Sequence, residues 1–86
     1  MERIFPVEEV LFVFGKWTLM MDSVRCAGLE VGATVDLLDE AGQRLGDAVI
    51  GAFLKTQNPT IQPIELVRGA ADGDVRRVRM VRLRGV

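Results

Sequence analysis

Hydrophobic and polar residues alternate along most of this chain with a period of two residues, and the spacing typical of an amphipathic helix is missing. The segment 33–38 shows the pattern most clearly, because Val35 and Leu37 are expected to face inward and Thr34 and Asp36 outward. No window of eleven or more residues keeps a helical spacing without a glycine or a competing period-two pattern. The pattern therefore predicts strands throughout.

Clusters of Gly, Asp, Asn and Pro divide the chain into six expected strands. These cover about 6–14, 17–26, 33–38, 44–55, 60–67 and 75–84. Gly42 is expected to supply a positive φ in the hairpin turn at 39–46. Pro59 and Pro63 predict a short edge strand, because proline cannot donate to a ladder. In the last strand the alternation slips between Met80 and Val81, which indicates a bulge.

Six short antiparallel strands in 86 residues predict an all-β fold of one domain, residues 1–86. A chain this short has few other means of protecting open sheet edges, so the expected architecture is a small closed barrel with Greek-key-like connections. The hydrophobic content of 49% excludes an intrinsically disordered segment and suggests apolar surface left over for a partner.

Several classes of site and location are disfavoured by composition. Cys26 is the single cysteine and cannot form an intramolecular disulfide, and the chain has no histidine to act as a base or metal ligand. The most apolar segment, 10–21, is interrupted by Gly15 and Lys16 and is far shorter than the ~20 residues that span a bilayer. With no signal-peptide pattern at the N-terminus, the expectation is a cytoplasmic protein without membrane association.

The segment from Phe5 to Asp39 carries a series of short motifs, and two more lie near the other end of the chain. They are Pro6-Val7-Glu8-Glu9-Val10, Gly15-Lys16, Thr18-Leu19-Met20, Val24, Val31-Gly32 and Val35-Asp36-Leu37, with Gly73-Asp74 and Leu83 to Val86 at the other end. In these residues the segment from Phe5 to Asp39 resembles the start of the second domain of elongation factor Tu, a β-barrel shared by the translational GTPases. The resemblance implies an elongation factor Tu domain 2-like barrel, in which the Val31-Gly32 step turns the chain into the third strand. The middle of the chain, 44–72, matches only loosely.

The departures from that family bear on function. No phosphate-binding loop of the G-x-x-x-x-G-K-[ST] type is present, so neither a GTPase domain nor nucleotide binding is expected. In the family, an acidic residue helps to form the pocket for the aminoacyl end of transfer RNA, and that position falls on Gly51. The family's asparagine near the closing motif falls on Val75, and its thr-gly-arg glycine falls at Asp22-Ser23. The resemblance therefore does not extend to capture of aminoacyl-tRNA.

Charge is divided between the two ends of the sequence. Residues 66–86 hold six arginines and two aspartates, whereas residues 1–65 hold five basic and ten acidic residues. The candidate contact residues for a partner or RNA are Arg76, Arg77, Arg79, Arg82 and Arg84. Spaced along a strand, their guanidinium groups would meet successive phosphates. The alternatives are that they pair with the acidic residues of the first part of the chain, or that they meet an acidic protein surface.

The first predicted strand is apolar on both faces, although one face of a small barrel strand normally meets water. Leu11, Val13 and Trp17 are therefore the candidate apolar interface, with a packed core position as the alternative for Trp17. Catalysis is not expected, because Ser23 and Cys26 have no histidine to activate them. Adjacent carboxylates on a strand point to opposite faces, and no cofactor or metal motif is present.

The sequence predicts a non-catalytic binding module that acts through protein contact or self-association, without a cofactor. The alternative is a module associated with RNA or the ribosome through its C-terminal arginines. A small-ligand pocket at a barrel mouth is a third hypothesis, for which the sequence supplies no convergent polar residues.

Overall fold

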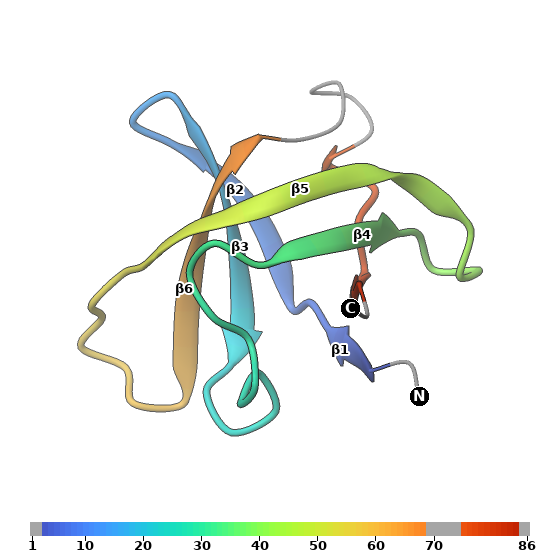
Figure 1. Cartoon of the computed structure of the whole chain (residues 1–86). Helices are drawn as coiled ribbons and strands as arrows, with labels where there is room; N and C mark the ends of the chain where they lie inside the picture. The colour runs from blue at the N-terminus through green and yellow to red at the C-terminus, as the bar shows by residue number, and fades with distance from the viewer. Residues whose placement is uncertain (1–2, 69–74, 85–86) are drawn as a thin grey trace.

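The computed structural model describes residues 3–68 and 75–84, which contain seven β-strands (Figure 1); among the described residues only Val75 is helical. The strands are β1 (Arg3–Pro6), β2 (Glu9–Val13), β3 (Lys16–Asp22), β4 (Thr34–Leu38), β5 (Arg44–Phe53), β6 (Ile61–Arg68) and β7 (Met80–Leu83). They form one antiparallel sheet in the order β1-β7-β4-β5-β6-β3-β2. The part β7-β4-β5-β6 has the strand order of a Greek key.

The predicted all-β antiparallel fold is confirmed, but the predicted six-stranded closed barrel is wrong in both strand number and closure. The sheet has seven strands, and β1 and β2 form its two edges without pairing to each other. The expected strand at 6–14 divides at Val7-Glu8, because the N–H of Val7 donates to Arg79 C=O (2.9 Å) while the N–H of Glu8 donates to Met20 C=O (2.8 Å). Consecutive residues thus donate their hydrogen bonds at opposite ends of the sheet, so the segment forms two strands, β1 and β2, instead of one.

The longest strand, β5, changes partners along its length. Its first half pairs with β4, from Arg44 to Val49, and its second half pairs with β6. In Figure 1 it runs beside β4 at one end and reaches β6 at the other. The register shifts on both sides of Ile50, so the strand bends where the partner changes. Gly51 lies at this bend, and a Cβ there would meet Val67 Cγ1 at 2.1 Å.

The expected edge strand at 60–67 is instead the interior strand β6, which lies between β5 and β3. Pro63 pairs with Met20 in the register and is buried. Leu54 N–H donates to Pro63 C=O (2.9 Å), and the return bond to Leu54 C=O comes from Gln62 Nε2 at 2.9 Å. The side-chain amide of Gln62 therefore replaces the N–H that Pro63 lacks, and an interior proline is tolerated.

The expected strand at 75–84 contains only four strand residues, those of β7. Val75 and Val78 are both buried, and the N–H of Val78 donates to Val75 C=O (3.1 Å), which is the spacing of a turn. Met80 and Val81 pair with β4 without interruption, so the predicted bulge is absent. The slip in alternation marks the boundary between this turn, 75–79, and β7.

One face of the sheet packs into an apolar core, which confirms the inward placement of Val35 and Leu37. The buried apolar residues of β3 to β7 include Leu19, Met21, Val35, Leu37, Ile50, Ile64, Leu66 and Val81. Gly42 has the expected positive φ of 85°, and Gly32, with φ of 91°, precedes β4. Asp36 lies on the other face of β4 as predicted, yet only 7% of the residue is exposed. Neighbouring side chains on the outer face must therefore cover Asp36.

Candidate binding surfaces

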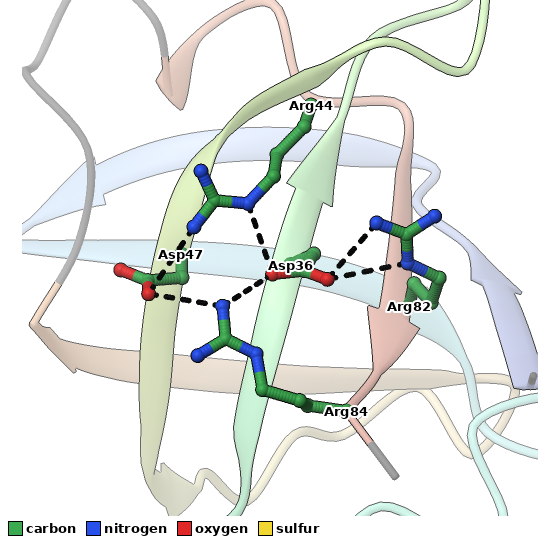
Figure 2. Close-up of polar contacts among 5 residues, drawn as sticks. All are labelled: Asp36, Arg44, Asp47, Arg82 and Arg84. Carbon is green, nitrogen blue, oxygen red and sulfur yellow. Dashed lines mark hydrogen bonds and ion pairs between the residues drawn. The ribbon is translucent and has the colours of Figure 1, made fainter.

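Asp36 is covered by three arginine side chains on the outer face of β7, β4 and β5 (Figure 2). Arg82 donates from Nε and Nη2 to Asp36 Oδ2 at 3.2 and 3.0 Å. Arg44 Nε donates to Asp36 Oδ1 at 3.2 Å, and Arg84 Nη2 donates to the same oxygen. Water is excluded from the carboxylate by guanidinium groups that also neutralise it, so the charge is buried without being left unpaired.

The sheet register explains why this cluster forms. Asp36 lies directly opposite Arg82 on β7 and directly opposite Asp47 on β5. Two carboxylates in opposite positions repel each other, so the row needs cations beside it. Arg84 Nη2 bridges the two aspartates through Asp47 Oδ2 (3.1 Å), and Arg44 Nη2 lies 3.4 Å from the same oxygen. We call these five residues, Asp36, Arg44, Asp47, Arg82 and Arg84, the outer-face cluster.

The pKa of Asp36 reflects two opposing effects. Burial of the carboxyl raises its pKa, but the hydrogen bonds from Arg84, Arg82 and Arg44 together outweigh burial and lower the pKa from 3.8 to about 2. The hydrogen bonds of Arg84 to Asp36 and, to a smaller extent, to Asp47 raise the pKa of Arg84 above its usual value. Asp36 is therefore charged throughout the physiological range.

We expect this depressed pKa to make the protein less stable in acid. The folded state stabilises the charged form of Asp36 relative to the unfolded state. The contribution of this group to the free energy of unfolding is therefore complete above pH 4 and is lost as pH falls through about 2. The shift corresponds to about 2 kcal/mol of unfolding free energy. Urea unfolding of the wild type and Asp36→Asn at several pH values measures it. Equal pH dependence in the two proteins would contradict the assignment.

The other three candidate arginines lie in the 75–79 turn and not on a strand. The guanidinium carbon of Arg76 lies 5.1 Å from the centre of the Trp17 ring. Arg77 Nη2 is 3.6 Å from Asp39 Oδ2. Arg79 Nη1 donates to the carbonyls of Val78 (2.8 Å) and Arg76 (3.2 Å). The run predicted as one arginine strand is thus divided into a turn group and a strand group.

The alternative that the arginines pair with acidic residues of the first part of the chain is confirmed for Arg77, Arg82 and Arg84. Within residues 3–68 and 75–84 no such ion pair involves Arg76 or Arg79, whose guanidinium groups meet an indole ring and backbone carbonyls, respectively. These contacts hold the side chains in place but leave Arg76 and Arg79 exposed. A role for any of the five in binding remains a prediction.

The β2–β3 hairpin carries the most exposed aromatic residues of the described chain. Phe14 and Gly15 form its two-residue turn with φ angles of 51° and 78°, and Phe14 is 100% exposed. Phe12 is 51% exposed and meets Trp17 edge to face, with ring centres 4.8 Å apart. Positive φ at both central residues is the geometry that suits the twist of a hairpin, although a bulky side chain rarely adopts it.

The structure divides the predicted apolar interface between two faces of the hairpin, because Trp17 pairs with Phe12 and not with Leu11 or Val13. Leu11 and Val13 are half-buried on the outer face of β2, and Trp17 is half-buried against the core from β3. Phe12 and Phe14, the more exposed residues of the hairpin, are not among the predicted interface residues. A signal for them was available, since Phe14-Gly15 is a two-residue turn between alternating stretches, which places the phenylalanine at a tip.

The described residues offer little to a catalytic or metal site. Cys26 is buried, and burial is the main cause that raises the pKa of its thiol above 9.0. In residues 3–68 and 75–84 no group of three or more carboxylates, cysteines and histidines could hold a metal ion. A hollow of about 330 Å³ is lined by Asp39, Arg77 and Arg79, with the first two paired to each other. Within the same ranges no helix is long and apolar enough to span a bilayer.

Comparison with known proteins yields no relative for this chain: no protein-family model, no curated protein and no solved structure matches it. The hairpin and the outer-face cluster must therefore be interpreted from their own geometry.

Proposed function

We propose that this chain is a non-catalytic binding module that contacts a protein partner through the β2–β3 hairpin. The observation that carries the proposal is Phe14, a fully exposed aromatic residue with a φ of 51°. This conformation costs free energy, and full exposure returns none of it through burial within the chain. Burial of the Phe14 ring against a partner would offset this cost, since aromatic residues dominate the energetics of protein interfaces.

The surrounding residues extend this surface. Phe12 and Trp17 pack edge to face behind the tip, and Arg76 lies over the Trp17 ring. We define the hairpin surface as Phe12, Phe14, Trp17 and Arg76. It combines a rigid aromatic pair with one cation, which is the residue composition enriched in interface hot spots. The exposed rings of Phe12 and Phe14 suit a partner surface better than a small ligand, which binds in a concave site.

The resemblance to the second domain of elongation factor Tu supports a place for this module among translation-factor-like domains. That proposal rests on the matching residues between Phe5 and Asp39. In the described chain two of these matches take turn positions, Gly15 in the hairpin and Gly32 before β4. The closing Gly73-Asp74 and Gly85-Val86 lie outside the described residues.

The alternative function is RNA binding, and one observation favours it. Arg76 stacks on Trp17 beside two exposed phenylalanines, although these residues are distant in sequence. Single-stranded nucleic acids bind to surfaces that combine stacking rings with guanidinium groups. The arginines of β7 are weaker support for RNA, because the outer-face cluster already engages Arg82 and Arg84.

Capture from a native lysate with the tagged chain tests the proposed function. We expect the double variant Phe12→Ser/Phe14→Ser to lose at least tenfold of the bound partner, because it removes both exposed rings. The matched control is Val24→Ser/Val31→Ser, which removes apolar side chains that are 80% and 62% exposed elsewhere. Equal capture by the double variant and the wild type would overturn the proposal. Loss of the partner after nuclease treatment would favour RNA.

A further inference from the structure

The outer edge of β2 presents backbone groups that no described strand pairs. β2 is the last strand of the sheet and pairs with β3 alone. Val13 and Lys16 flank the two-residue turn and so form a hydrogen-bonded pair, as does every second pair along the ladder. The N–H and C=O groups of Val10 and Phe12 consequently point away from β3. The ligand that fits such an edge is another strand.

The two edges of the sheet differ in their protection against strand pairing. β1 contains Pro6, which has no N–H to donate, and begins with Arg3. In β2, by contrast, residues 10–13 are all apolar and include no proline, lysine or arginine. Natural proteins usually block an edge that must remain free, so the unblocked edge of β2 is the one adapted to pairing.

We propose that β2 pairs antiparallel with β2 of a second copy of this chain, about a two-fold axis at Leu11. This inference rests on the proposed function, because it uses the same hairpin and names its partner. Val10 and Phe12 lie at equal distances along the chain from Leu11, so each exchanges hydrogen bonds with the other residue of the second copy. Leu11 then faces the second copy's Leu11, and Glu9 faces its Val13.

Charge favours this arrangement over the parallel one. The exposed Glu8 and Glu9 lie at one end of β2, whereas the nearest cation at its other end, Lys16, already pairs with Glu65 at 3.1 Å. Antiparallel pairing places the glutamates of the two copies at opposite ends of the contact, where they do not face each other. Parallel pairing would place the glutamates of both copies together, which is unfavourable.

Sedimentation velocity of the full chain, from low to high micromolar concentration, tests the dimer. The wild type is expected to shift from 9.5 kDa to twice that mass. Leu11→Lys is expected to remain at 9.5 kDa throughout, because two ammonium groups would face each other at the axis. Ile4→Lys is the matched control, since Ile4 is a 52% exposed apolar residue on the opposite edge strand, and it should dimerise normally.

Amide hydrogen exchange locates the contact. In the dimer, exchange at Val10 and Phe12 should be slowed at least tenfold relative to Leu11→Lys at equal concentration. A wild type that stays monomeric, or a dimer in which these two amides exchange as fast as in Leu11→Lys, would overturn the inference. A monomeric wild type that still captures a different protein through Phe12 and Phe14 would leave the proposed function standing while removing this partner.

Discussion

Replacing Asp36 with asparagine is expected to lower the free energy of unfolding by about 3 kcal/mol, as measured by urea denaturation at neutral pH. The substitution keeps the shape of the side chain but removes the negative charge that Arg82 contacts and that Arg44 and Arg84 share. Arg44 and Arg84 are half-exposed and regain water contacts in the variant. We therefore expect the lower end of the range for breaking a buried ion pair.

The matched control for this prediction is Asp47→Asn, one position across in the same cluster. Asp47 also contacts Arg44 and Arg84, but half of its side chain is exposed. Exposed ion pairs contribute little, so the loss should stay below about 1 kcal/mol. Similar losses in the two variants would contradict the prediction that the buried Asp36 contributes more to stability than the half-exposed Asp47.

Gly51→Ala should lower the free energy of unfolding by about 2 kcal/mol, the size typical of overpacking. Its Cβ would lie 2.1 Å from Val67 Cγ1 and 3.4 Å from Glu65 C=O. Both neighbours belong to β6, which pairs with β5 at this bend, so the strands must separate or Val67 must change its rotamer. Thermal or urea unfolding measures the loss.

A double-mutant cycle identifies the cause of that loss. Val67 is 53% exposed, so Val67→Ala alone should cost little. In the Val67→Ala variant, Gly51→Ala should lower the free energy of unfolding by about 1 kcal/mol less than it does in the wild type. The reason is that the Val67 methyl group that the new Cβ would contact has been removed. If the two substitutions simply add, contact with Val67 does not limit the site.

The strand pattern of this fold could be predicted where each strand has one buried face. Val35 and Leu37 are fully buried, and Gly42 takes the expected left-handed conformation. The errors arose where backbone partners decide the structure. The split at Val7-Glu8 depends on which carbonyl each N–H reaches, and the interior position of Pro63 depends on the side chain of Gln62. Alternation of apolar residues carries no information about either.

The candidate sites were predictable only in part. The arginines were predictable as candidates, with pairing to acidic residues as one alternative. They were expected on one strand because the turn at Val75–Val78 also places apolar residues inward. The outward position of Asp36 was predicted but its burial was not, because the side chains that cover it are distant in sequence. Burial of a polar residue by distant partners depends on the strand order, and no local pattern encodes that order.

The strand order also determines when the sheet can be completed during synthesis. β7 lies between β1 and β4, so the first strand of the chain has no neighbour in the sheet until the last strand has been made. Until then β4 has one open side, and Asp36 lacks both Arg82 and Arg84. Long-range pairing of this kind slows folding and leaves strands exposed meanwhile. We therefore expect the nascent chain to complete its sheet only after residues 80–84 have left the ribosome, and stalled fragments to expose unpaired strand edges.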